Sequence, residues 1–349
     1  MSDEQPLAGA SAGLARADVC LLTGASGFIG GRVAERLAGA CSLRCLVRAS
    51  SDVSRLAGLG VELVAGDLAD RRSLERASEG CRYVLHCAAL VSDWARRGEI
   101  VAANVTGTRN LLDAAAGASV ERLVYVSSTD VYAHPGGRGV DETHVPRRFA
   151  NWYAQTKLEA EAHVRAAQSA GTLETVVLRP ATVYGPGSTD VVGEIARALR
   201  AGHMLLIDKG RAIAGLCYVE NVVDAALLAL ASPAAAGEAF NVSDGVEVTW
   251  RQFTDDLAAG LGCAGARFSL PYGVASAIGC SLEHAYRALR AGTGLTLPAL
   301  LSRQAVQVLG RDQDFSNRRL RETLGWEPRV GYAAGLDATL GWLRGELGC

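Results

Sequence analysis

The sequence predicts an α/β fold in which a doubly wound parallel sheet is followed by a smaller C-terminal substrate-binding lobe. Two observations carry this prediction. Short apolar segments of strand length alternate with amphipathic segments of helix length, as in parallel strands joined by crossover helices. The first of these strands also runs directly into a glycine-rich turn and a helix, which is the strand-turn-helix unit of a Rossmann-type sheet.

The glycine-rich turn has the clearest chemistry in the sequence. An apolar run covers residues 19–22, three glycines follow with the spacing Gly-x-x-Gly-x-x-Gly, and an amphipathic segment covers residues 28–37. Gly24 would allow a sharp turn, Gly27 would let the backbone approach a pyrophosphate, and Gly30 would let the helix pack on the strand. The unpaired N–H groups of the helix N-terminus would face the phosphates. We therefore predict a dinucleotide site formed by Gly24, Ser26, Gly27, Phe28, Ile29 and Gly30.

The second predicted strand, residues 43–48, ends in a basic residue, Arg48, and Ser51 follows closely. In nucleotide-binding sheets this strand end meets the adenine ribose, where an acidic residue would hydrogen-bond the 2′-hydroxyl group. A guanidinium with nearby hydroxyl groups instead favours a 2′-phosphate. We therefore predict NADP(H) as the cofactor in preference to NAD(H).

The following elements continue the alternation of strands and helices. We predict strands at residues 61–64, 83–87 and 123–128, and helices over about 71–79, from Asn104 onward and over about 153–167. Because parallel sheets bind ligands at the carboxyl ends of their strands, residues just after these strands are expected to contact the cofactor. The predicted contacts in this part of the chain are Asp67, Leu68, Cys87, Ala88, Ala89 and Asn104.

A serine, a tyrosine and a lysine form the candidate catalytic set. Ser128 ends the fifth strand, and Tyr153 and Lys157 lie at positions i and i+4 of the next helix, on one face. Free tyrosine has a pKa of about 10, and a nearby ammonium group lowers it, so the hydroxyl group can donate a proton to a carbonyl oxygen. Ser128 would hold that oxygen by a hydrogen bond. Tyr153 and Lys157 are also expected to contact the cofactor.

Composition excludes several classes of function. A net charge of −2 over 349 residues gives no electrostatic signature for nucleic-acid binding. Nine cysteines without a Cys-x-x-Cys pair, and six histidines without ligand spacing, predict no metal site.

Residues 1–17 lack the basic and apolar regions of a signal peptide and are predicted to be a disordered tail. No apolar run reaches membrane-spanning length, so we expect a cytoplasmic protein without a stable membrane anchor.

Three motifs resemble the extended branch of the short-chain dehydrogenase/reductase family. Residues 23–30 are similar to its Thr-Gly-x-x-Gly-x-x-Gly loop, residues 127–132 to its Ser-Ser-x-x-Val-Tyr segment, and Tyr153 with Lys157 to its catalytic pair. In this family the residue four positions before the tyrosine of the second motif is catalytic, and that residue is Ser128 here.

The resemblance covers nearly the whole chain and implies how it is divided. Residues 178–187 match the family segment that closes over the nicotinamide, which implies cofactor contacts at Pro180 and Val183. Residues 18–182 are expected to form the dinucleotide-binding domain with the catalytic residues. Residues 183–349 are expected to supply the substrate lobe and to return to the central sheet.

Two positions indicate the branch within the family. Nucleotide-sugar epimerases and dehydratases usually carry an asparagine at the position of Thr182 and an arginine at that of Ala214, both of which contact the diphosphate of the substrate. Because this chain has neither the asparagine nor the arginine, it lacks two side chains that would bind the phosphates of such a substrate. Residues 89–94, 219–223 and 270–272 instead resemble 3β-hydroxysteroid dehydrogenase-like members. The substrate contacts that we expect on this basis are Ser92, Trp94, Thr129 and Tyr184.

The resemblance implies an NADP(H)-dependent oxidoreductase that interconverts a ketone and a secondary alcohol on a mainly apolar small molecule, as a 3β-hydroxysteroid dehydrogenase-like enzyme or a biosynthetic ketoreductase. The alternative is a nucleotide-sugar epimerase or dehydratase with tightly bound NAD. A non-catalytic protein that senses NADP is disfavoured, because the tyrosine–lysine pair is intact. The apolar face of residues 274–289 is expected to face the core or to cover a pocket. The sequence leaves open the substrate, the direction of the reaction and whether the chain forms a homodimer.

Overall fold

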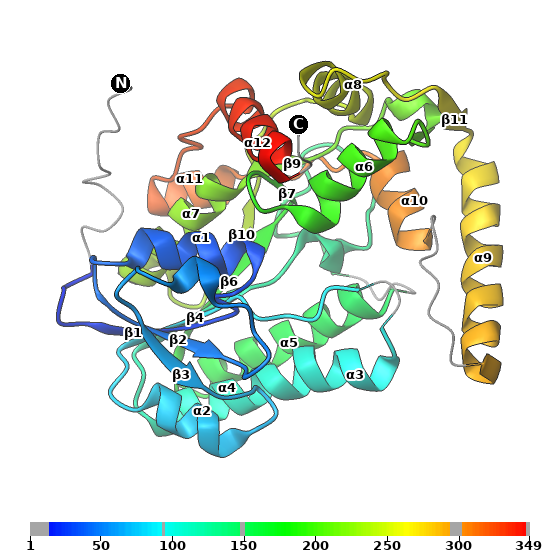
Figure 1. Ribbon diagram of the computed structural model, residues 1–349. Coiled ribbons are helices and arrows are strands. Elements are labelled where there is room, and N and C mark those ends of the chain that lie inside the picture. Colours follow the sequence, from blue (N-terminus) through cyan, green and yellow to red (C-terminus); the bar gives the residue numbers. More distant parts are fainter. Residues whose placement is uncertain (1–13, 93–94, 147–150, 294–301, 347–349) are drawn as a thin grey trace.

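The centre of the computed structural model is a parallel sheet with helices on both faces (Figure 1). The structure describes residues 14–92, 95–146, 151–293 and 302–346, with only the backbone of 287–293. The sheet has seven strands in the order β10-β6-β5-β4-β1-β2-β3, and every pairing is parallel. Its strands are β1 (Val19–Thr23), β2 (Ser42–Val47), β3 (Glu62–Ala65), β4 (Tyr83–His86), β5 (Arg122–Val126), β6 (Glu174–Pro180) and β10 (Ala239–Val242). The predicted fold class is confirmed.

The strand order reverses beside β1, since the chain leaves it first toward β2 and β3 and later returns to β4 on its other side. Loops on the two sides of such a reversal separate and leave a crevice at the carboxyl ends of the strands. The turn after β1 and the loop after β4 therefore border the expected ligand site.

Two helix layers bury the apolar faces of the sheet. One core contains Val33, Val222 and Leu320, from helices on one face, and a second core contains Leu74, Leu111 and Ala160, from helices on the other. The first layer consists of α1 (Phe28–Leu37), α7 (Val219–Ala231) and α11 (Arg318–Leu324). The second consists of α2 (Arg71–Ser78), α4 (Gly107–Gly117), which continues α3 (Arg97–Val101) through a π-helical turn, and α5 (Trp152–Ser169).

The second half of the chain builds a smaller set of elements at one end of the sheet. Its core includes Tyr184, Trp250, Phe253 and Leu340. Two short parallel pairs lie there, β7 (Thr182–Tyr184) with β9 (Leu216–Tyr218) and β8 (Leu205–Ile207) with β11 (Phe268–Leu270). The helices are α6 (Glu194–Arg200), α8 (Trp250–Gly260), α9 (Tyr272–Thr293), α10 (Arg303–Gly310) and α12 (Tyr332–Glu346). Strand β10 and helix α7 also come from this half, but they pack against the main sheet.

Helix α9 presents a different face to the protein from the one predicted. Its apolar residues Val274, Ile278 and Leu282 are 48%, 39% and 42% exposed. The side that faces the body carries Ala275, Gly279 and Glu283 instead. Small residues are needed there because α9 lies close to α10: a Cβ atom on Gly279 would lie 3.3 Å from Cγ2 of Val306. No helix among the described residues combines the length and the apolar character needed to cross a membrane.

The predicted disordered tail, residues 1–17, lies mostly outside the described residues. Its last residues are described, and among them Leu14 is buried in the core on the α1 side of the sheet. The ordered chain thus begins before residue 18, because this leucine covers apolar side chains that would otherwise meet water.

Candidate active site

The turn after β1 has the shape that a pyrophosphate requires. Gly24 has a φ of +77°, and a Cβ atom there would lie 2.6 Å from the amide nitrogen of Ala88, so the loop after β4 packs directly on the turn. Gly27 is the N-cap residue of α1, no side chain caps its N–H groups, and the first turn has no acidic residue. A helix N-terminus without an internal cap suits an anion, so the residues present fit the diphosphate of a dinucleotide.

The predicted adenine-ribose side is formed by the loop after β2, where Arg48 is exposed. The loop is closed by two hydrogen bonds, from the Ser51 amide to the Arg48 carbonyl (2.9 Å) and from the Arg48 amide to Ser51 Oγ (3.2 Å). A second cation, Arg55, lies against α1, and one of its guanidinium nitrogens donates to Glu35 Oε1 at 2.9 Å. Our sequence reasoning missed Arg55, because its place depends on how the loop folds back onto α1.

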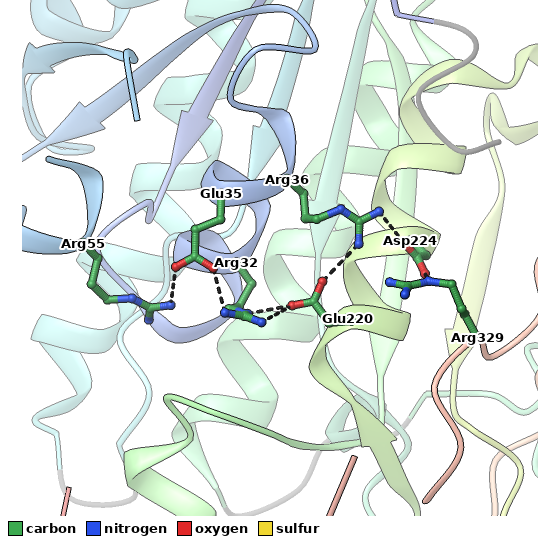
Figure 2. A network of polar contacts seen from close by, with 7 residues as sticks. All are labelled: Arg32, Glu35, Arg36, Arg55, Glu220, Asp224 and Arg329. Atoms are coloured by element: carbon green, nitrogen blue, oxygen red, sulfur yellow. Dashed lines mark hydrogen bonds and ion pairs between the residues drawn. The ribbon is translucent and has the colours of Figure 1, made fainter. Parts of the chain in front are cut away.

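Arg55 is the first member of a chain of ion pairs that crosses from the cofactor side of α1 to α7 (Figure 2). Acidic and basic side chains alternate along it, with N–O distances of 2.6 to 3.1 Å. Because both carboxylates on α7 are held by arginines of α1, the helix that offers its N-terminus to the phosphates is fixed to its neighbour. The members in order are Arg55, Glu35, Arg32, Glu220, Arg36, Asp224 and Arg329.

The three candidate catalytic side chains converge at the end of β5. Ser128 caps a 3-10 helix, Thr129–Tyr132, and its Oγ accepts a hydrogen bond from the Asp130 amide at 3.1 Å. Tyr153 lies in the first turn of α5, with its hydroxyl group close enough to Ser128 for that side chain to lower its pKa. Lys157, one turn later, is 3% exposed and donates from Nζ to the Val126 carbonyl at 2.8 Å. The structure therefore brings Ser128, Tyr153 and Lys157 into one site, as the sequence predicted.

The electrostatics of the pair differ from the prediction. Burial raises the pKa of Tyr153 well above its usual value, the negative charge of Asp130 raises it further, and the hydrogen bond with Ser128 opposes both effects. Burial lowers the pKa of Lys157 to about 8, although Cys87, Glu161 and Asp130 oppose this. We expected the ammonium group to lower the pKa of the tyrosine, but burial raises this pKa and Lys157 is not among the groups that shift it. Tyr153 is therefore protonated at neutral pH, as a proton donor must be.

A buried ion pair lies behind the catalytic residues. Glu161, on α5 one turn after Lys157, accepts two hydrogen bonds from Arg179 of β6 (3.0 and 2.7 Å) and one from Ser127 Oγ (2.6 Å). Burial by itself would raise the pKa of Glu161, but the hydrogen bonds and charge of Arg179 outweigh it, so the pKa is lowered and the carboxylate stays ionised. The Ser127 hydroxyl group is thus used inside the protein, and Ser128 alone of the two serines meets Tyr153.

A comparison with models of known protein families shows the family of this chain. Residues 20–243 match the model of the NAD dependent epimerase/dehydratase family. The chain belongs to this family.

Individual relatives indicate the branch. The 4-hydroxy-2-methyl-3-oxo-4-farnesyl-3,4-dihydroquinoline-1-oxide ketoreductase of Stigmatella aurantiaca is 35% identical over 322 residues, 91% of this chain and 94% of the relative. The 2-alkyl-3-oxoalkanoate reductase of Shewanella oneidensis is 31% identical over 79% of this chain and 74% of its own. The crystal structure of gox2253 superposes with a TM-score of 0.77 at 28% identity, covering 94% of this chain and 98% of that one. The chain is an NAD(P)-dependent oxidoreductase of the extended short-chain dehydrogenase/reductase type.

The loop after β4 contains three of the predicted cofactor contacts. Cys87, Ala88 and Ala89 are all partly exposed there, beside the glycine turn. Asn104, which we predicted to bind the cofactor, is only 2% exposed and is used by the protein itself. Its amide group bonds the Leu90 amide (2.7 Å), the Leu90 carbonyl (3.1 Å) and Thr156 Oγ1 (3.1 Å). It ties the loop to the catalytic helix instead.

The other predicted cofactor contacts vary in exposure. Asp67 is exposed, and its carboxylate accepts a hydrogen bond from the Ala69 amide at 2.8 Å. Leu68 is half-buried over Gly107, where a Cβ atom would lie 2.8 Å from the leucine side chain. Pro180 is buried at the end of β6, and Val183 is half-buried in β7. The turn residues Ser26, Phe28 and Ile29 are all at least partly exposed, as predicted contacts should be.

The predicted substrate residues do not form one group. Ser92 is half-buried in the loop after β4, Thr129 is buried directly after Ser128, and Trp94 lies outside the described residues. Tyr184 is fully buried in an aromatic cluster, with ring centroids 5.4 Å from Tyr218 and 5.8 Å from Phe253. Pairing of β7 with β9 turns this ring into the lobe core, so no face of it is open to a substrate. Among the described residues, no three His, Cys, Asp or Glu side chains could hold a metal ion.

Proposed function

We propose that this chain is an NADP(H)-dependent ketoreductase that interconverts a ketone and a secondary alcohol on a mainly apolar small molecule. The convergence of Ser128, Tyr153 and Lys157 at the carboxyl edge of the sheet carries this proposal. Two relatives named as reductases, the farnesyl quinoline-oxide ketoreductase and the 2-alkyl-3-oxoalkanoate reductase, support the same chemistry.

The roles of the three side chains follow from their contacts. When bound, NADPH supplies the hydride for the carbonyl carbon. Ser128 Oγ already accepts a hydrogen bond from the Asp130 amide, so its own proton is directed to another acceptor and can hold the substrate carbonyl oxygen. Tyr153 donates its proton to that oxygen as negative charge develops on it. The Lys157 ammonium group, fixed on the Val126 carbonyl, would bind the nicotinamide ribose and stabilise the tyrosinate left behind.

Two positions favour an apolar substrate over a nucleotide sugar. Ala214 is fully buried and its amide is bonded to the Val248 carbonyl at 2.9 Å, so no cation for a diphosphate can extend from this position. Thr182 lies in β7 and bonds the Gly215 carbonyl through its amide at 2.8 Å. Neither position supplies the anchor that nucleotide-sugar enzymes use, so we place the substrate among lipophilic ketones.

The choice of NADPH over NADH rests on Arg48, which is exposed in the loop after β2 and would bind the 2′-phosphate. Arg48→Asp should lower affinity for NADPH by about tenfold or more, because a charge-assisted contact contributes roughly 1.5–3 kcal/mol, while affinity for NADH should change little. Titration of both cofactors against protein fluorescence measures this. Equal affinity of the unmodified protein for NADPH and NADH would end the assignment.

The substrate class is tested by following NADPH oxidation with steroid ketones, aryl ketones, 3-oxoalkanoates and nucleotide sugars. We expect turnover with one of the lipophilic ketone classes. Conversion of a nucleotide sugar by protein that is purified with bound NAD would identify an epimerase or dehydratase instead.

A further inference from the structure

A second polar cluster lies just after the 3-10 helix Thr129–Tyr132, and the mechanism above does not use it. Its centre is His134, which is 1% exposed and directly follows the 3-10 helix that begins after Ser128. Both Ala133 and His134 have positive φ values, +59° and +51°. Two successive non-glycine residues in the left-handed region are uncommon, and such backbone is held by its surroundings, often beside active sites.

The hydrogen bonds around His134 determine which ring nitrogen carries a proton. Gln313 donates from Nε2 to the Arg311 carbonyl at 2.9 Å, so the other end of its amide, Oε1, faces His134 Nδ1 at 2.8 Å. An amide oxygen can only accept, so Nδ1 must donate. In the neutral ring Nε2 is then an acceptor, and Gln304 Nε2 donates to it at 2.9 Å.

This neutral arrangement leaves one polar atom unsatisfied. Gln304, on α10, is 8% exposed, and its Oε1 has no hydrogen-bond partner among the described residues. A protonated ring would change this, because Nε2 would become a donor. Two acceptors are within reach: Gln304 Oε1, after a half-turn of the amide, and Asp130 Oδ1, which is 3.5 Å from Nε2.

Asp130 connects this cluster to the reacting groups. Its amide holds Ser128 Oγ, and the negative charge of its carboxylate raises the pKa of both Tyr153 and Lys157. A positive charge on His134 would pair with that carboxylate and weaken its effect on the tyrosine. Further charged and titratable groups lie on the neighbouring described elements. They include Arg311, which donates to the His134 carbonyl at 3.4 Å, Tyr272 of α9, which accepts from Arg311, the Glu283–Arg303 pair, and Arg138 with Asp312 and Asp314.

We propose that His134 is a positioning residue that holds α10 of the lobe to the catalytic loop through Gln304 and sets the charge beside Tyr153 through Asp130. The inference rests on the proposed role of Tyr153 as proton donor. It predicts that protonation of His134 makes Tyr153 a better acid, so the reduction rate should rise as the pH falls through the His134 transition. The pH range to be scanned is the one in which the protein stays folded.

The test compares three variants across this pH range. His134→Gln keeps the hydrogen bonds of the neutral ring, because its amide can donate to Gln313 and accept from Gln304, but it cannot be protonated. Asp130→Asn removes the charge that connects the histidine to Tyr153, and His203→Gln, at an exposed site, controls for the change of residue type. All four proteins should share the inflection of Lys157, whose pKa is about 8. We expect kcat of the wild type and of His203→Gln to show a second inflection that is absent from both His134→Gln and Asp130→Asn. Superimposable profiles for the wild type and His134→Gln would overturn the proposal.

A second measurement needs no turnover. Nitrogen-15 NMR of the imidazole groups, with the His134 signal assigned by its loss in His134→Gln, should show a neutral ring protonated at Nδ1 at high pH and a transition on acidification. The same spectrum is expected for Tyr153→Phe, so an error in the proposed function leaves this result readable. A ring protonated at Nε2 at high pH, or no transition of the ring over the pH range in which the protein stays folded, would refute the proposal.

Discussion

At the scale of single residues, Tyr153 carries the proposed chemistry through one hydroxyl group. Tyr153→Phe keeps the ring and its packing but removes the proton, so kcat should fall by about 10²–10⁴-fold, the usual contribution of general acid catalysis. Affinity for NADPH and the unfolding temperature should stay close to those of the wild type. Steady-state kinetics and a cofactor titration measure these effects separately. Full turnover by the variant on a true substrate would make the residue structural.

Removing the charge of Lys157 should abolish activity without lowering the stability of the protein. Its pKa is lowered from 10.5 to about 8 by burial, and one pKa unit corresponds to about 1.4 kcal/mol, so keeping the side chain charged at low pH costs roughly 3 kcal/mol. Since the folded pKa lies below the unfolded value, this cost is absent above the unfolded pKa and fully present below about pH 8. Lys157→Met should therefore abolish turnover while its unfolding temperature at pH 6 is equal to or above that of the wild type. A clear loss of stability would mean that the ammonium group is well paired in the protein.

That the three candidate catalytic residues lie together could be predicted because each stands at a fixed distance from a local signal: Ser128 ends a strand, and Tyr153 and Lys157 share a helix face. The residues that support them had no such signal. Arg179 meets Glu161 only because β6 lies beside β5 in the sheet. The internal partners of Asn104 could not be predicted for the same reason, since Leu90 and Thr156 lie 14 and 52 positions away.

At the scale of elements, the partly buried ion pairs between α1 and α7 should contribute more to the free energy of unfolding than an exposed ion pair does. Glu220 bridges Arg32 and Arg36 with its side chain 11% exposed. Glu220→Gln leaves two arginines without their shared carboxylate and should lower the free energy of unfolding by about 1–3 kcal/mol. Urea unfolding followed by circular dichroism measures this change.

The matched control is Glu194→Gln on α6. Glu194 is also 2.6 Å from its arginine, Arg197, but the two side chains are 68% and 49% exposed. Exposed pairs contribute between about 0 and 1 kcal/mol, so this variant should unfold close to the wild type. Equal effects of the two substitutions would show that burial does not decide the strength of the α1–α7 contact.

Elements with strong local signals were predicted well, and those whose packing depends on distant partners were not. The predicted helix over residues 28–37 matches α1 in both bounds, since a glycine turn begins it and its apolar spacing is regular. The apolar face of α9 does not pack into the core, because close approach to α10 requires small residues on the side that faces it. That this face covers a pocket stays a prediction. Periodicity in a sequence identifies an apolar face but does not say how near the neighbouring helix lies.

At the scale of the whole molecule, the dinucleotide-binding half cannot cover its own sheet. Val222 and Phe240, from α7 and β10, complete the core on one face and come from the second half of the chain. A chain that ends at residue 182 should therefore lack a cooperative unfolding transition and should bind a hydrophobic dye, although it carries every catalytic residue. Calorimetry and dye fluorescence provide the test, with the full chain as control. A sharp transition in the shortened chain would mean that this half folds alone.

The place of β10 in the sheet also has a consequence for how the protein is made. Synthesis proceeds from the N-terminus, so β6 emerges from the ribosome with an unpaired edge that stays open until residues 239–242 follow. During that interval the nascent chain also exposes the sheet face that α7 will later cover. Production in cells should consequently depend on chaperones that shield this edge, and slow translation across residues 181–238 should increase aggregation of the newly made chain.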